Sequence, residues 1–256
     1  MRVDAVILAG ADNDGALGAV SSEKYEAAID VGGKPMLYYV LAGVLCARSV
    51  DRVTVVGPVD ALRPIIHSAG WANRVSLVER RDSIVENLMA GLGNVPVGKK
   101  ALVVTGDIPF ITGEALDDFV ARCEKKPAAV HYALVLRSTN EAKFPGVKRT
   151  YVKMADGVMT GGNVFMVDPE VVARNRDIIS EAVKLRKKPF QLLRMLGLKL
   201  MLRFAFGRLT IGDVERKVEE WLGLQGRGII SPYAEIGVDV DKPSDLALAR
   251  QVLAGR

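Results

Sequence analysis

The chain has 256 residues, of which 49% are hydrophobic and 25% charged, and its formal net charge is +5 at pH 7. This composition is ordinary for a soluble globular protein, and the modest positive charge suits anionic small molecules without implying nucleic acid as a partner. Residues 1–10 lack the pattern of a signal peptide, and no stretch reaches the roughly 20 apolar residues of a membrane-spanning helix. We therefore expect a cytoplasmic protein.

Apolar runs alternate with segments of helical spacing along the first half of the chain. The pattern predicts strands at 4–9, 53–57, 75–78, 101–105 and 130–136, and helices at 34–48, 60–69, 82–92 and 112–123. Beyond residue 137 it predicts short strands at 151–154 and 164–167, a strand at 236–241 and a closing helix at 243–253. Alternating strands and helices indicate a three-layer α/β/α fold around a mostly parallel mixed sheet. Since no repeat or linker interrupts the chain, we expect a single domain over 1–256.

Residues 174–222 form a basic helical insertion in this pattern. Cations at 184, 186–188, 194, 199, 203 and 208 alternate with leucine, methionine and phenylalanine. One interpretation is a helical hairpin packed on the sheet, with its cations in water and their stems covering apolar surface. The other is a peripheral membrane or self-association contact through the basic helices 184–208.

The first strand ends in Leu8-Ala9-Gly10, followed by a loop rich in small and polar residues. Parallel strands present ligand-binding loops at their carboxyl ends, so chemistry is expected from Gly10 onwards. Gly10 and Gly15 have the spacing of a phosphate-binding P-loop, but Ala16 and Leu17 stand where Lys and Ser or Thr are required. The dinucleotide fingerprint G-x-G-x-x-G is also missing. A P-loop enzyme and a dinucleotide-dependent redox enzyme are therefore disfavoured.

Five groups of residues, in chain order, resemble the motifs of nucleotidyltransferases with a GT-A-like fold. That superfamily includes molybdenum cofactor guanylyltransferases, sugar-phosphate nucleotidyltransferases and methylerythritol-phosphate cytidylyltransferases. The groups are 8–10 with 24 and 31–37, then 80–84, 105–109, 161–165 and 237–246. The resemblance implies a GT-A-like fold and transfer of a nucleoside monophosphate from a nucleoside triphosphate to a phosphorylated small-molecule acceptor, with release of pyrophosphate. It also implies Mg²⁺ as cofactor and no nucleic acid as partner.

The resemblance implies a role for each matching residue. Those expected to bind the nucleotide are Leu8, Ala9, Gly10, Lys24, Asp82, Ser83 and Asp107. Lys24 and Asp107 are the expected catalytic residues, because a lysine supplies a point charge to phosphates and a carboxylate binds a hard cation. Gly162 and Asn163 are expected to contact the acceptor, and Asp107 with Asp239 to hold the metal.

Other roles remain open for two of these positions, Ser83 and Asp239, and for the neighbouring Asp241 and Asp245. Ser83 either hydrogen-bonds the base or begins its helix. Asp239 and Asp241 alternate along the predicted strand and share a face. Asp239 is preferred as the metal ligand, whereas Asp241 and Asp245 can also favour the start of the closing helix.

The loop 11–19 departs from the superfamily pattern, because it contains Asp12 and Asp14 and lacks the usual arginine. Either the loop binds an extra cation, or Lys34 or Arg81 replaces the arginine, or the triphosphate chemistry is weakened. Two alternatives to a nucleotidyltransferase therefore stay open. One is a glycosyltransferase that uses a nucleotide-sugar, since residues 239–241 mimic a D-x-D pair. The other is a non-catalytic module that binds a nucleotide or a partner.

Overall fold

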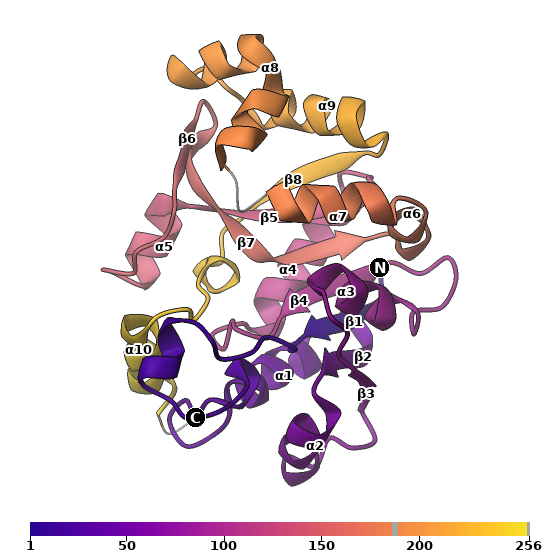
Figure 1. Ribbon diagram of the computed structural model, residues 1–256, viewed down its shortest axis with the longest axis vertical. Coiled ribbons are helices and arrows are strands. Elements are labelled where there is room, and N and C mark those ends of the chain that lie inside the picture. The colour runs from indigo at the N-terminus through magenta and orange to yellow at the C-terminus, as the bar shows by residue number, and fades with distance from the viewer. Residues whose placement is uncertain (186–188, 255–256) are drawn as a thin grey trace.

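The computed structural model describes residues 1–185 and 189–254, and within them an eight-stranded mixed sheet forms the centre of the fold (Figure 1). The strands are β1 (Val3–Leu8), β2 (Val50–Gly57), β3 (Val75–Glu79), β4 (Ala101–Thr105), β5 (Val130–Leu136), β6 (Val152–Met154), β7 (Gly157–Val167) and β8 (Gly226–Ser231). Their order is β3-β2-β1-β4-β7-β5-β8, and β6 pairs with β7 outside this order. The strands β1 to β4 are mutually parallel, β5 is parallel to β8, and β7 is antiparallel to β4, β5 and β6.

Helices cover both faces of this sheet. They are α1 (Met36–Cys46), α2 (Val59–Ser68), α3 (Ile84–Leu92), α4 (Gly113–Glu124), α5 (Arg137–Lys143), α6 (Pro169–Arg174), α7 (Arg176–Leu185), α8 (Pro189–Ala205), α9 (Ile211–Leu222) and α10 (Pro243–Leu253), with 3-10 turns η1 (Ala16–Ala19), η2 (Glu26–Ala28) and η3 (Ala234–Gly237). Apolar side chains of α1, α2 and α4 pack on one face, and those of α3, α6 and α7 on the other. The predicted three-layer α/β/α fold is confirmed.

The central strand β1 is buried on both faces, as its continuous apolar sequence indicates. Ile7 belongs to the core under α1 and α4, and Val6 to the core under α3; both side chains are fully buried. Leu8 pairs with Thr105, so β1 and β4 end at the same level. The sheet therefore brings the loops after β1 and β4 together at its carboxyl edge.

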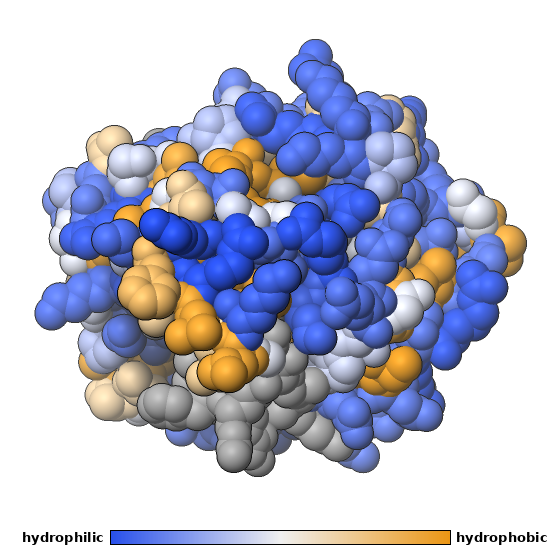
Figure 2. Space-filling model, turned by 90° about the horizontal axis from the view of Figure 1, so that it is seen from above, coloured by the Kyte–Doolittle hydropathy of each residue, from blue (hydrophilic) through white to orange (hydrophobic). Residues whose placement is uncertain are grey.

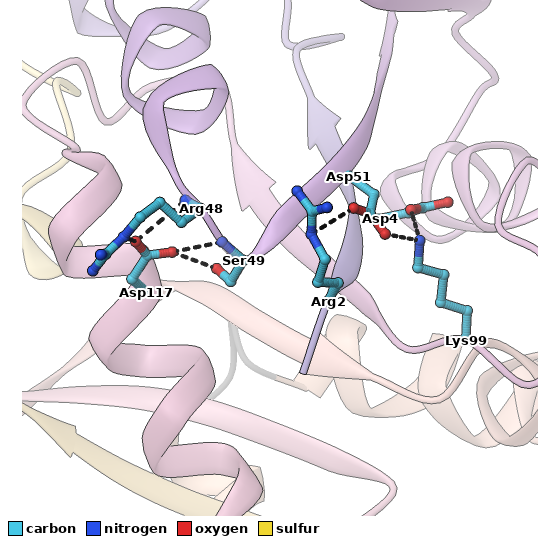
Figure 3. A network of polar contacts seen from close by, with 7 residues as sticks. All are labelled: Arg2, Asp4, Arg48, Ser49, Asp51, Lys99 and Asp117. Carbon is cyan, nitrogen blue, oxygen red and sulfur yellow. Dashed lines mark hydrogen bonds and ion pairs between the residues drawn. The ribbon is translucent and has the colours of Figure 1, made fainter.

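The opposite, amino edge of the sheet is held by ion pairs and hydrogen bonds (Figure 3). Lys99 Nζ lies 2.5 Å from Asp4 Oδ1 and 2.6 Å from Asp51 Oδ2. The hydrogen bond from Lys99 is the main reason that the pKa of Asp51 is lowered. On α4, the Asp117 carboxylate accepts hydrogen bonds from the backbone N–H and hydroxyl of Ser49, at the start of β2. These polar side chains fix the strand ends far from the loops at the carboxyl edge.

Three segments differ from the sequence predictions. Residues 236–241 do not form a strand: they begin as the end of η3 and continue as an extended segment outside the sheet. The strand in this part of the chain is β8, which the sequence analysis did not predict because glycines interrupt its apolar pattern. The strand predicted at 164–167 begins at Gly157, so residues 161–163 lie inside β7.

The basic insertion is helical, as predicted, and its helices have different surroundings. α7 packs against α3 on the sheet, and α9 packs against the strand β8. α8 contacts α7 and α9, and it lies with α9 at one end of the molecule (Figure 1). Residues 186–188 of the insertion lie outside the described residues. Among the described residues, no helix has the length and apolar character needed to cross a membrane.

The approach of α1 to the segment before α4 gives a test of this packing. A Cβ added at Gly43 would lie 2.3 Å from the backbone oxygen of Ile111. Alanine gains about 1 kcal/mol of helix propensity over glycine, but the overlap with backbone outweighs this gain. We expect Gly43→Ala to lower the free energy of unfolding by about 2 kcal/mol or more, measured by denaturant titration. Gly93→Ala is the control, since its nearest neighbours would be 3.5 Å away. Equal stability of the two variants would contradict this packing.

Candidate active site

Three carboxylates meet at the carboxyl edge of the sheet. Asp107 follows β4, and Asp239 and Asp241 lie on the extended segment after η3. One carboxylate oxygen from each lies within 4.8 Å of the other two. The sequence analysis preferred Asp239 to Asp241 as the second metal ligand, but the structure places both beside Asp107. We call these residues the acid cluster.

The alternation of residues 238–241 explains how two carboxylates reach Asp107. Val238 and Val240 are fully buried in an apolar cluster that also contains Leu17 and side chains of α10. Because successive side chains of an extended segment point to opposite sides, Asp239 and Asp241 face away from that cluster. The Val240 N–H donates a 2.9 Å hydrogen bond to the Asp107 carbonyl. The predicted shared face therefore exists without the predicted strand.

The acid cluster carries negative charge that the protein only partly neutralises. Burial, followed by the charge of Asp239, raises the pKa of Asp107 to about 6, although the Thr105 hydroxyl donates a hydrogen bond to its carboxylate. Burial and the charges of Asp239 and Asp107 raise the pKa of Asp241 to about 7. Glu26, from η2, also has its pKa raised to about 7 by burial and by Asp107. Carboxylate oxygens are the ligands that Mg²⁺ takes from proteins, so this donor set fits a hard divalent cation.

Arg149 is a site residue that the sequence analysis missed. Its side chain is 8% exposed, and its Nη atoms lie 3.1 Å from Asp239 Oδ1 and 3.3 Å from Asp245 Oδ2. It also donates hydrogen bonds to the carbonyls of Gly237 and Asp239. Arg149 thereby fixes the segment that carries Asp239, and it ties this segment to the first turn of α10. Its neighbours in the sequence form no strand or helix, which left no pattern to reveal it.

Side chains of the loop after β1 hold the loop in its conformation. The Asn13 amide donates hydrogen bonds to the carbonyls of Ser21 and Glu23, and Leu17 is fully buried. Arg80, which follows β3, reaches into this loop: its Nη1 lies 2.9 Å from both the Gly10 carbonyl and Asp12 Oδ1. The loop without an arginine of its own is therefore contacted by an arginine from the segment after β3, which is separated from β1 by β2 in the sheet.

Lys24 lies beside the same loop and is exposed. Its Nζ is 5.1 Å from the centre of the Tyr25 ring, and the Arg80 guanidinium is 5.0 Å from that centre. Two cations thus converge on one aromatic ring next to Gly10. Lys34, considered as a replacement for the missing arginine, lies over the ring of Tyr38 instead, at 3.9 Å.

The remaining predicted nucleotide-binding residues have structural contacts of their own. The Ala9 N–H donates to the Val56 carbonyl in the sheet, so this amide is already engaged. Leu8 is the last residue of β1. Ser83 begins α3 by accepting a hydrogen bond from the Glu86 N–H, which supports the helix-start alternative, and Asp82 precedes it on the surface.

The predicted acceptor residues lie in β7, opposite the end of β4. Val104 of β4 pairs with Val164, so Asn163 lies one residue beyond this pair, beside the segment that leads to Asp107. A Cβ at Gly162 would lie 2.7 Å from Ile236 Cγ2 in η3. The missing side chain of Gly162 therefore lets η3 approach the sheet, and η3 in turn leads into the segment with Asp239.

Comparisons with known proteins identify the family and the fold of the chain. A family model described as the MobA-like NTP transferase domain matches residues 5–155. A hypothetical transferase from Thermus thermophilus is 34% identical, with a TM-score of 0.81 over 96% of this chain and 100% of that chain. Two enzymes share the fold at lower identity. A CMP:2-keto-3-deoxy-manno-octonic acid synthetase complexed with CTP has 16% identity and a TM-score of 0.60 over 99% of each chain. A 4-diphosphocytidyl-2C-methyl-D-erythritol synthase from Anaerococcus prevotii has 13% identity and a TM-score of 0.62 over 98% of this chain and 96% of that chain. Curated protein sequences gave no match.

The raised pKa values predict that metal-free stability depends on pH. In an unfolded chain the carboxyls of Asp107, Asp241 and Glu26 have pKa values of about 4. In the folded chain their pKa values are about 6 to 7. Between these limits the folded state binds more protons, so its stability falls as the pH rises through this window. With a chelator present, we expect Asp241→Asn to raise the melting temperature at about pH 8 and to have little effect near pH 4. Asp60→Asn, on the surface of α2, is the control. An Asp241→Asn effect that does not change with pH would contradict the prediction.

Proposed function

The chain belongs to the family of MobA-like NTP transferase domains, and from this premise we propose which reaction it performs. It transfers a nucleoside monophosphate from a nucleoside triphosphate to a phosphorylated small-molecule acceptor, and it releases pyrophosphate with the help of Mg²⁺. The observation that supports this proposal is the acid cluster, whose three carboxylates lie at the carboxyl edge of the sheet beside the loop after β1.

The acid cluster suits a magnesium ion that is held together with substrate phosphates. Asp107, Asp239 and Asp241 would hold the ion, which would neutralise negative charge on the phosphoryl oxygens. The contribution of the chain is to keep these carboxylates together through the buried Val238 and Val240. Preorganised ligands avoid a reorganisation cost when the nucleotide enters.

Arg80 and Lys24 supply the positive charge that the triphosphate needs. In phosphoryl transfer, catalysis comes mainly from positioning the reactants in line and from stabilising charge on the phosphoryl oxygens. The Arg80 guanidinium is held by Asp12 at 2.9 Å, and a triphosphate presents the same kind of anionic oxygen. We therefore assign Arg80 the role of the arginine that the loop lacks, with Asp12 as its partner before the nucleotide binds.

The acceptor would enter from the side of β7. Asn163 lies beside the end of β4, and its amide can donate hydrogen bonds to phosphate or hydroxyl oxygens. The nucleotide enters from the other side, over the loop after β1. The acid cluster lies between these two elements, where the phosphorus and the attacking oxygen must meet.

The direct test is pyrophosphate release from each of the four nucleoside triphosphates with Mg²⁺, across a panel of sugar and polyol phosphates. CTP merits the first trial, since one fold relative is complexed with it. Release that requires both an acceptor and Mg²⁺ supports the proposal. Nucleotide binding without turnover would favour a binding module, and consumption of sugar nucleotides without pyrophosphate would favour a glycosyltransferase.

Asp107 gives the sharpest test of the acid cluster. We expect Asp107→Ala to lower Mg²⁺-dependent turnover more than about a hundredfold, because the variant loses a ligand from β4 that the loop cannot replace. It should also abolish the rise in melting temperature that Mg²⁺ with nucleotide produces. Asp118→Ala, which removes a carboxylate paired with Arg122 on α4, is the matched control. Wild-type turnover by Asp107→Ala would refute the central role of this residue.

Substitutions of Arg80 and of its neighbour Arg81 test which arginine serves the loop after β1. Arg80 contacts Gly10 and Asp12, whereas the Arg81 side chain is exposed. We expect Arg80→Met to weaken nucleoside triphosphate binding about tenfold or more, the effect of losing a charge-assisted hydrogen bond. Arg81→Met should change it by less than about twofold. Titration calorimetry measures both, and a larger effect at Arg81 would reverse the assignment.

A further inference from the structure

The second half of α8 and the turn that follows it expose apolar side chains to solvent. The helix is broken at Gly197, where φ is 80°, and the residues that follow face outward. Leu198 and Phe206 are each 74% exposed, Leu202 is 51% exposed and Met201 is 36% exposed. We call these four residues the α8 stripe. Figure 2 looks down on this end of the molecule and shows apolar side chains gathered among hydrophilic ones.

The spacing of the α8 stripe places its members on one outward face. Its members follow one another at three, four and eight residues from Leu198, which is one face of an α-helix. The inward side is mixed: Leu200 and Phe204 are half-buried there, and Arg203 Nη2 lies 3.0 Å from the buried carboxylate of Asp213 on α9. This part of the chain therefore carries apolar side chains on its outward face as well as on its inward one. An outward apolar face of this kind is a candidate surface for docking.

The segment of the sequence that contains the stripe is strongly basic. Residues 184–208 contain eight lysines and arginines and neither aspartate nor glutamate. Of the 35 basic residues in the chain, 27 remain elsewhere against all 30 acidic ones, so the rest of the protein is slightly negative. In the described part of α8, Lys199 is exposed beside the stripe, and Arg208 is exposed just after it. Long basic side chains can extend from an apolar surface toward anionic groups.

We propose that the α8 stripe docks on a lipid bilayer that carries anionic phospholipids. A face of leucine, methionine and phenylalanine flanked by cations is the pattern of helices that lie in the membrane interface, where apolar burial and attraction to anionic lipid act together. A second copy of this chain is a poorer partner, because dimerisation through α8 would bring two strongly basic segments together. An anionic surface complements the same charge.

The test is co-sedimentation of the full chain with vesicles. We expect binding to vesicles of phosphatidylglycerol and phosphatidylcholine in equal parts, and much weaker binding to phosphatidylcholine alone. The triple variant Leu198→Gln, Leu202→Gln, Phe206→Gln should lose at least about tenfold in partition onto the anionic vesicles. Lys199→Gln with Arg208→Gln should lose several-fold, and added salt should reproduce that loss in the wild type.

Val97→Gln is the matched control, because Val97 is 90% exposed in the loop before β4, and it should bind vesicles as the wild type does. Thermal unfolding and the shift produced by Mg²⁺ with nucleotide verify that each variant is folded. Three results would overturn the proposal. These are no binding of the wild type to anionic vesicles, equal binding of the wild type and the triple variant, or a wild-type dimer in sedimentation that the triple variant dissociates.

Discussion

Mutual repulsion among three carboxylates is the constraint on which the carboxyl edge of this protein depends. Asp107, Asp239 and Asp241 offer oxygens within 4.8 Å of one another. Burial, and after it this repulsion, raises the pKa of Asp107 to about 6 and that of Asp241 to about 7, which records the cost of keeping the two groups charged. No isolated loop would hold such a cluster, because like charges this close drive flexible segments apart. The surrounding fold must therefore contribute more free energy of stabilisation than the repulsion among these carboxylates removes.

Two features oppose that repulsion. The first is apolar: Val238 and Val240 are fully buried with Leu17, so the same cluster anchors the acidic segment and the loop after β1. The second is the buried Arg149, which donates to the backbone carbonyls of Gly237 and Asp239 and pairs with the carboxylates of Asp239 and Asp245. Arg149 neutralises part of the charge without closing the cluster, since Asp107 and Asp241 still have raised pKa values. Packing thus fixes the positions of the carboxylates, and Arg149 limits the repulsion.

The sequence predicted the features that depend on local pattern. The buried strand β1 and the helices α3 and α4 follow from apolar runs and helical spacing, and the resemblance to nucleotidyltransferases pointed to Asp107 after β4. The segment 236–241 was predicted as a strand because its apolar and polar residues alternate. This alternation does not distinguish a strand that is hydrogen-bonded in a sheet from an extended segment that packs on an apolar cluster. Arg149 was missed for a different reason, and so was the contact of Arg80 with the loop, although Arg80 belongs to the matching group 80–84. Each acts through partners about 70 to 100 residues away, and such distances leave no trace in local spacing.

The loop after β1 shows how a departure from a family pattern is compensated. Its two aspartates would repel a triphosphate if they stood alone, yet Asp12 is paired with Arg80. The same guanidinium holds the Gly10 carbonyl at 2.9 Å, so this cation both neutralises the loop and fixes its start. Under the proposed function, a substrate phosphate would compete with Asp12 for Arg80, since both offer anionic oxygens. Asp12 would then hold Arg80 in position until the nucleotide binds, and Arg80, from the segment after β3, would take the role of the arginine that the loop lacks.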